Sequence, residues 1–302
     1  MRGRLVFFAV VAAAILFAPD FALAQVTVNE RLAPGQSPLI VAHRAKGGGF
    51  PENSLAGIQN ALDLGVDMVK IDTQLTRDGR YILMHDPTLN RTTDVEAVYP
   101  AGPPNGPTRE TSGGADYIRD YTLEEIKRLR LLDGSSGGDH AVPTLEEALD
   151  LVDGRLLVAL DLKVYEIESI AALLNRRDTE HLLLFGFYYF DPRVLLDVST
   201  VTDIRTSVTM PRARDYLVDL DSLFAAQGSQ LAMISVTSKN LSPELVAKAE
   251  ELGVALSVGP DGGEDSALLH EADAGPWLRT LNNGAKAFVT GHPAALLELL
   301  NR

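Results

Sequence analysis

The chain has 302 residues, no cysteine, and a formal net charge of −14 at pH 7 from 27 basic and 41 acidic residues. The absence of cysteine excludes disulfides and thiolate-bound metals, so the fold must depend on its own apolar core. The acidic excess argues against nucleic acid and anionic lipid as partners, because both are negatively charged. An anionic small-molecule ligand would need a site with its own local positive charge.

The first 24 residues have the pattern of a secretory signal peptide. Arg2 and Arg4 precede an apolar run from Leu5 to Ala18, and small residues end the segment at Ala24. The run is short for a membrane span, and no later stretch of about 18 apolar residues follows. We therefore expect an exported protein, periplasmic or secreted, without a stable membrane anchor. Without this leader, which carries a net charge of +1, 278 residues with a charge of −15 remain.

From residue 39 onward, short runs rich in Val, Ile and Leu alternate with segments of helical period, as in repeated βα units. Eight runs are predicted to be strands. They lie at 39–45, 68–76, 156–163, 181–187, 204–210, 231–237, 254–260 and 285–292. This number of units in 278 residues predicts an α/β fold, a (β/α)₈ TIM barrel that forms a single domain over residues 25–302.

The alternation stops after the second strand region, between about residues 90 and 142. The run "YPAGPPNGPTRETSGG", residues 99–114, is too rich in Pro and Gly for the interior of a helix or strand. Long loops in compact domains are usually functional or mobile. We interpret this insertion as a lobe over the barrel mouth that contributes to substrate choice; a surface loop without that role is the alternative.

Two predicted strands carry paired opposite charges. Lys70 and Asp72 lie two residues apart, as do Asp161 and Lys163, so the members of each pair share one face of a strand. Facing the interior of a barrel, these charges must pair with each other, a metal or a ligand, because an unpaired buried charge costs several kcal/mol. Two ion pairs that only fix the strand register are the alternative to a functional site.

Two histidines follow apolar runs and are expected at the same rim. His43 ends the first predicted strand, and His85 follows the second strand region. Barrels of this type place their active sites at the carboxyl ends of the strands. An imidazole titrates near neutral pH and suits general acid–base catalysis. Hydrogen-bonded core histidines are the alternative.

The segment "VAHRAKGGGFPENSLAGIQNALDLGVDMVKIDTQLTRDGRYILMHDPTLNRTTD", residues 41–94, resembles the N-terminal signature of the glycerophosphodiester phosphodiesterase family. The runs "YTLEEIKRLR", "VPTLEEALDLV" and "VALDLK" continue the resemblance in the same order, and it fades after Lys163. The resemblance implies a barrel that cleaves glycerophosphodiesters to sn-glycerol 3-phosphate and an alcohol. It also implies two catalytic histidines and a divalent metal held by carboxylates.

Matched by position, the resemblance assigns the catalytic roles to His43 and His85. Arg44, Glu52 and Lys163 then contact a small-molecule phosphodiester, and Asp72 and Asp161 hold Mg²⁺ or Ca²⁺. Lys70 departs from the family pattern, which has a second carboxylate ligand at this position.

Three accounts of Lys70 remain open. In the first account, the Lys70 ammonium takes the place of the metal: Asp72 and Asp161 hold it, and it faces the phosphate. This arrangement resembles the metal-independent bacterial phospholipases C, which act as lyases. Alternatively, a weakened metal site persists on the two aspartates with Glu52, or catalysis is lost and a phosphodiester-binding barrel remains. The sequence does not choose between water and a neighbouring substrate hydroxyl as the nucleophile.

Three other features at the predicted rim each have two interpretations. The loop from Ala45 to Phe50 contains three glycines and either wraps a phosphate with backbone N–H groups or is simply a flexible connection. The aromatic run 188–190 after the fourth strand either lines an alcohol pocket or packs in the core. His292 has no family counterpart and is either a contact at the rim or a polar loop residue.

Overall fold

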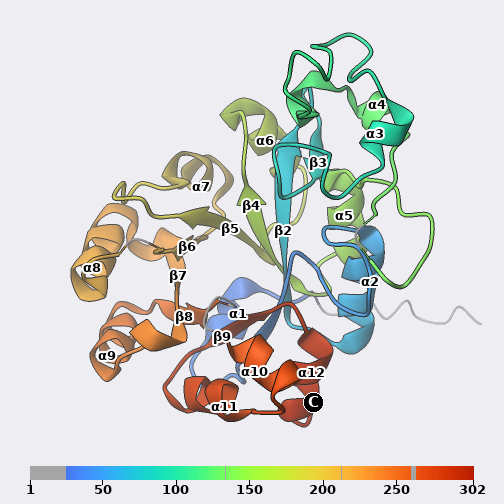
Figure 1. The fold of residues 1–302 in the computed structure, drawn as a ribbon. Helices are drawn as coiled ribbons and strands as arrows, with labels where there is room; N and C mark the ends of the chain where they lie inside the picture. Colours follow the sequence, from blue (N-terminus) through green and yellow to red (C-terminus); the bar gives the residue numbers. More distant parts are fainter. Residues whose placement is uncertain (1–24, 133, 212, 260–262) are drawn as a thin grey trace, which may run out of the picture.

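The computed structural model describes residues 25–132, 134–211, 213–259 and 263–302 (Figure 1). The predicted signal peptide lies outside these residues, so export stays a prediction. Within the described ranges, no helix is long and apolar enough to cross a membrane.

Eight parallel strands in the described part of the chain close a barrel. They are β1 Leu39–His43, β2 Met68–Leu75, β4 Leu157–Leu162, β5 Leu182–Phe187, β6 Thr206–Thr209, β7 Leu231–Val236, β8 Ala255–Val258 and β9 Ala287–Thr290. The neighbours follow the order β1-β9-β8-β7-β6-β5-β4-β2, and β2 pairs back with β1 to complete the ring. The predicted (β/α)₈ barrel is confirmed. A short strand that the sequence did not predict, β3 Tyr81–Leu83, pairs antiparallel with the end of β2.

The inner face of the barrel changes from apolar to polar along the strands. Leu39 and Val41 of β1, Met68 of β2, and Leu157 and Ala159 of β4 form part of one buried inner cluster. Alternate residues such as Ile40 and Val69 belong to a second cluster between the strands and the helices. Since alternate strand residues share a face, the next inward positions after the apolar ones are His43, Lys70 and Asp161. The apolar layer therefore forms a floor beneath the polar groups.

Helices cover the outside of the barrel (Figure 1). They are α2 Leu55–Leu64, α5 Leu145–Val152, α6 Ile167–Leu174, α7 Leu196–Thr202, α8 Tyr216–Gln227, α9 Pro243–Leu252, α10 Glu264–His270, α11 Gly275–Asn282 and α12 Pro293–Leu299. The short helix α1, Val28–Leu32, packs Val28 against the inner apolar cluster. The start of α5 is fixed by a capping box in which Thr144 accepts from the backbone of Glu147 and the Glu147 side chain accepts from Thr144.

Residues 84–143, which we call the lobe, contain the predicted insertion. The lobe carries α3 Val95–Val98, a 3₁₀ turn at Ile118–Asp120 and α4 Leu123–Ile126. Its apolar side chains, with Ile82, form a buried cluster of their own that includes Leu89, Val95 and Tyr121. Tyr121 donates to the fully buried Asp116 over 2.6 Å. The lobe is thus a packed substructure at the end of β2 and β3 (Figure 1), rather than a loose surface loop.

Candidate active site

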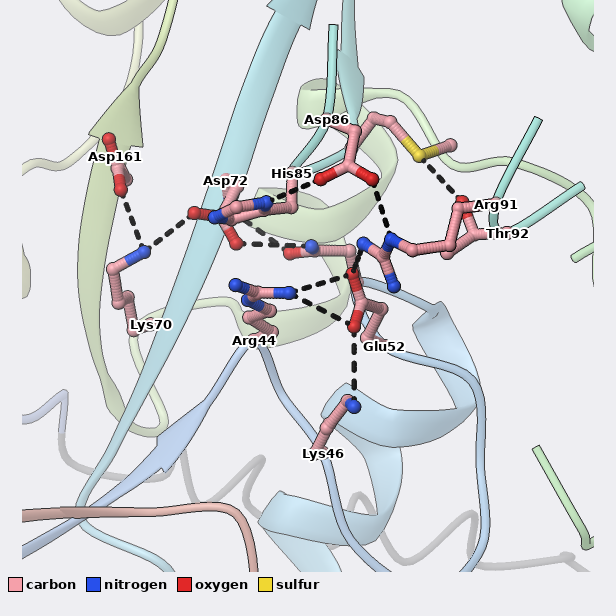
Figure 2. A network of polar contacts seen from close by, with 12 residues as sticks. Arg44, Lys46, Glu52, Lys70, Asp72, His85, Asp86, Arg91, Thr92 and Asp161 are labelled. Atoms are coloured by element: carbon pink, nitrogen blue, oxygen red, sulfur yellow. Dashed lines mark hydrogen bonds and ion pairs between the residues drawn. The ribbon is translucent and has the colours of Figure 1, made fainter. Parts of the chain in front are cut away.

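Lys70 lies between two buried carboxylates on neighbouring strands (Figure 2). The β2–β4 register places Asp72 directly beside Asp161. The Lys70 Nζ atom is 2.6 Å from Asp72 Oδ1 and 2.7 Å from Asp161 Oδ2, and all three side chains are almost fully buried. The ammonium therefore occupies the space between the two carboxylates where a bridging cation would bind.

A second ammonium and an amide complete the surroundings of the two aspartates. Lys163 Nζ is 2.6 Å from Asp161 and 3.3 Å from Asp72. The Asn53 amide donates to Asp72 Oδ2 over 3.1 Å, and its oxygen accepts from the Asp72 backbone N–H over 3.0 Å. Burial opposes the charge on Asp72, but Lys70 and Lys163, with the hydrogen bonds from Lys70 and Asn53, hold its pKa well below the usual range.

The residues around Lys70 do not fit a divalent cation. Mg²⁺ and Ca²⁺ require several oxygen ligands around one vacant position, and here that position holds an ammonium. In the ranges that the structure covers, no group of three or more His, Asp and Glu side chains is arranged to hold a metal. Glu52, the third ligand in the weakened-site account, contacts arginine and lysine side chains instead.

Glu52 is the centre of a second charged cluster. Its carboxylate, which is 2% exposed, is 3.2 Å from Arg44 Nη1, 3.3 Å from Lys46 Nζ and 2.6 Å from Arg91 Nη2. Burial opposes ionisation, but the hydrogen bond from Arg91 and the charges of Arg44, Arg91 and Lys46 together lower the Glu52 pKa. Arg44 belongs to the loop after β1, and Arg91 belongs to the lobe, so Glu52 connects these two parts of the molecule.

His85 is oriented by a chain of contacts within the lobe. Its Nδ1 atom is 2.7 Å from Asp86 Oδ1, and Arg91 Nε donates to Asp86 Oδ2 over 2.5 Å. The hydrogen bond from Arg91 is the largest influence on Asp86 and helps lower its pKa to about 2. Because this ionised carboxylate can only accept, Nδ1 of His85 donates a hydrogen bond to it, and Nε2 is left for a substrate.

His43 lies at the end of β1, opposite Lys70 in the β1–β2 register. Burial, followed by the positive charges of Lys70 and Arg44, lowers its pKa to about 3, while Asp72 acts in the opposite direction. A protonated His85 would lower the pKa further, so the two imidazoles are near enough to interact electrostatically. At neutral pH His43 is therefore an uncharged imidazole surrounded by cationic groups.

The structure brings the eight predicted site residues into two adjacent clusters. Sequence reasoning missed Lys46, Asp86 and Arg91. The signal for Asp86 was its position next to His85, and Arg91 follows in the same run, "HDPTLNR". With these additions, the site described above has five basic and four acidic side chains, a net charge of +1 in a chain of −14. His292 is exposed at the start of α12.

Comparisons with known proteins identify the family of the chain and agree with its fold. Residues 43–261 match the model of the glycerophosphoryl diester phosphodiesterase family. A glycerophosphodiester phosphodiesterase of Caldanaerobacter subterraneus is 27% identical over 273 residues, covering 87% of this chain and 98% of the relative. A solved glycerophosphoryl diester phosphodiesterase of Parabacteroides distasonis has a TM-score of 0.70 at 22% identity, with 92% of each chain covered.

A phosphodiesterase of Oleispira antarctica, solved in complex with sn-glycerol-3-phosphate, has a TM-score of 0.65 at 22% identity. That comparison covers 88% of this chain and 98% of the other. The family model spans more than half of the chain and includes both histidines and all the paired charges. The chain therefore belongs to the glycerophosphoryl diester phosphodiesterase family of phosphoric diester hydrolases.

Proposed function

We propose that the protein cleaves glycerophosphodiesters to sn-glycerol 3-phosphate and an alcohol, with His43 and His85 as the acid–base pair. The observation that carries the proposal is the position of these two imidazoles beside a net cationic cluster in an acidic protein. The names of the relatives and the product bound to the Oleispira enzyme support the same substrate class.

The two histidines have different surroundings and suit different roles. His43 is uncharged, as a general base must be before it takes a proton from the attacking hydroxyl. A bound phosphodiester adds a negative charge that offsets the cations lowering the His43 pKa, which favours proton transfer to this ring. As the general acid, His85 would enter the reaction as the imidazolium, with its Nδ1–H donated to Asp86 and its Nε2–H donated to the leaving oxygen. Arg44, Lys70 and Lys163 supply the charge that binds the phosphate.

We also propose that Lys70 takes the place of the family's metal and that the reaction needs no divalent cation. The support is the ammonium at 2.6 and 2.7 Å from the two carboxylates that would otherwise bind a metal. An ammonium carries one charge and stabilises developing negative charge less than a divalent ion does, so we expect slow turnover.

The test is release of glycerol phosphate from glycerophosphocholine. His43→Ala and His85→Ala should each reduce the rate by about 100-fold or more, because each removes one proton-transfer group. His270→Ala, at an exposed position in α10, is the matched control and should retain the rate. If His43→Ala still released glycerol phosphate at the original rate, the acid–base assignment would be wrong.

A second candidate function is favoured by the same lysine. Because Lys70 replaces a carboxylate that the family uses as a ligand, the barrel could bind a phosphodiester without cleaving it. Calorimetric binding of glycerophosphocholine without any phosphate product would support this binding role. Detection of sn-glycerol 3-phosphate or its cyclic phosphate would support the enzyme and identify the nucleophile as water or a substrate hydroxyl.

A further inference from the structure

A large cavity opens beside the site and continues away from it. It has a volume of about 1020 Å³, begins at Asp161 and Lys163, and extends past the end of β5 to α6 and α7. These two helices pack against each other on the outside of the barrel (Figure 1). Since ligand pockets usually measure roughly 300–1,000 Å³, the cavity is large enough for more than a glycerol phosphate.

One wall of the cavity is aromatic. Phe187 and Tyr189 are stacked with ring centroids 6.0 Å apart, and Phe185 meets Phe187 edge-on at 5.4 Å. Lys70 Nζ lies 4.7 Å from the Phe185 ring centroid, and Lys163 Nζ lies 5.2 Å from that of Phe187. The aromatic wall therefore begins at the ammonium groups that we assign to the phosphate and leads outward.

Aliphatic side chains that are partly open to solvent form another part of the lining. Ile167 of α6 is 36% exposed and Val201 of α7 is 48% exposed, and both line the cavity together with Leu196. Exposed apolar side chains that line a groove next to a charged site are typical of a binding surface. The adjacent acidic Asp197 accepts a hydrogen bond from Tyr165 at the edge of the cavity.

The loop between β5 and α7 is held in a strained conformation along the cavity, which we call the groove. Phe190 and Leu195 have φ angles of 74° and 58°, a region that side chains other than glycine rarely adopt. Gly186 allows the loop to approach the strand, because a Cβ atom there would lie 2.8 Å from the Leu195 Cδ1 atom. Such strain persists only where the surrounding structure maintains it, and it is frequent at ligand sites.

We propose that this groove binds the hydrocarbon chain of a single-chain phosphodiester, so that the enzyme prefers lysophospholipids over deacylated glycerophosphodiesters. The inference rests on the proposed function. Its support is the continuity between Lys163, which would contact the phosphate, and the apolar walls. A quaternary ammonium group such as choline is disfavoured on the aromatic wall, because Lys70 and Lys163 already lie over two of its rings and would repel a second cation.

The first test is a chain-length series of monoacyl glycerophosphocholines with about 6, 8 and 10 acyl carbons, used below the concentrations at which they form micelles. If the chain enters the groove, kcat/KM should rise by up to about fourfold for each methylene buried. A kcat/KM that stays at the value for glycerophosphocholine across the series would overturn the inference while leaving the proposed function intact.

A binding measurement separates the groove from catalysis. Alkylphosphocholines of increasing chain length, titrated calorimetrically as monomers, should show a Kd that falls by up to about fourfold per buried methylene even if no substrate is cleaved. Absence of cleavage with this trend would defeat the proposed function and retain the groove. A Kd independent of chain length would defeat the groove.

Two wall variants test the location. Val201→Asp and Ile167→Asp each introduce a carboxylate beside the expected chain, and the gain per methylene should fall to about twofold or less. Val218→Asp is the matched control, because Val218 is 62% exposed on α8 and does not line the cavity. Retention of the full chain-length dependence in both folded wall variants, as judged by thermal unfolding, would place the chain elsewhere.

Discussion

Replacing Lys70 with methionine tests whether the ammonium neutralises the two buried aspartates. The Lys70 Nζ atom contacts Asp72 and Asp161, which are 0% and 2% exposed. Methionine has a similar length but no charge. After the substitution, Lys163 supplies the remaining ammonium near both carboxylates, with its Nζ atom 2.6 Å from Asp161 and 3.3 Å from Asp72.

The expected loss of stability follows from this burial. Removing one partner of a buried ion pair costs about 3–5 kcal/mol, and the presence of Lys163 favours the lower value, about 3 kcal/mol. At roughly 2–4 °C per kcal/mol for domains of about 150–250 residues, Tm should fall by about 6–12 °C.

The difference between wild type and variant should depend on pH. The pKa of Asp72 is lowered in the folded protein, so its contribution to stability is present above its ordinary value of 3.8 and is lost as pH falls below that value. The Lys70→Met deficit should therefore be largest at neutral pH and narrow in acid.

Guanidinium unfolding followed by circular dichroism measures the differences in free energy of unfolding, and thermal unfolding measures the change in Tm. Lys248→Met is the matched control, because Lys248 forms a solvent-accessible ion pair with Asp221 at 2.8 Å and its loss should have no measurable effect. In a double-mutant cycle, Lys70→Met with Asp72→Asn should cost less than the sum of the single changes. A Lys70→Met protein as stable as wild type at pH 7 would refute the reasoning.

Three further predictions concern the metal, the lobe and pH. EDTA should leave wild-type activity intact, whereas the Lys70→Glu variant should bind a divalent cation that elemental analysis detects. Strong inhibition of the wild type by EDTA, reversed by Mg²⁺ or Ca²⁺, would contradict the proposal that Lys70 replaces the metal. Arg91→Ala should lower kcat by about tenfold, because His85 would no longer be oriented through Asp86. Arg119→Ala, at an exposed position of the lobe, is the control and should not lower kcat. Equal rates in the two variants would exclude this positioning role of Arg91. The pKa of His43 is lowered from 6.5 to about 3 in the folded protein, so as pH falls the unfolded chain takes up a proton at this residue before the folded protein does. This residue should therefore reduce the free energy of unfolding by about 2 kcal/mol between pH 6.5 and about 5. His43→Ala should weaken that dependence, and an unchanged slope of stability against pH would contradict the shifted pKa.

The barrel and the inward charges could be predicted because they follow from local pattern. Alternation with a period of two places Met68, Lys70 and Asp72 on one face, and the apolar residue comes first in the strand. Once parallel strands are expected, Asp161 must lie at the same rim as Asp72. The sequence therefore predicted that these charges pair with each other, a metal or a ligand, and in the structure they pair with each other.

The missed contacts depend on how distant segments pack. Arg91 reaches Glu52 across 39 positions because the lobe folds back over the loop after β1. The strand β3 is only three residues long and lies at the start of an irregular region. The groove beside α6 and α7 depends on how these two helices pack at the ends of β4 and β5 and on the left-handed backbone at Phe190 and Leu195. No sequence period reveals either feature.

The closure of the ring makes the first half of the chain dependent on the last strand. All eight predicted site residues lie between positions 43 and 163, yet β1, which ends in His43, is paired on one side with β9 at Ala287–Thr290. A fragment that stopped at residue 259 would contain every reactive group but would leave the β1 edge that β9 covers without a partner. Unpaired edges invite association with other chains, so incomplete products of synthesis should be inert and prone to aggregate. Activity should emerge only when the whole polypeptide has been made.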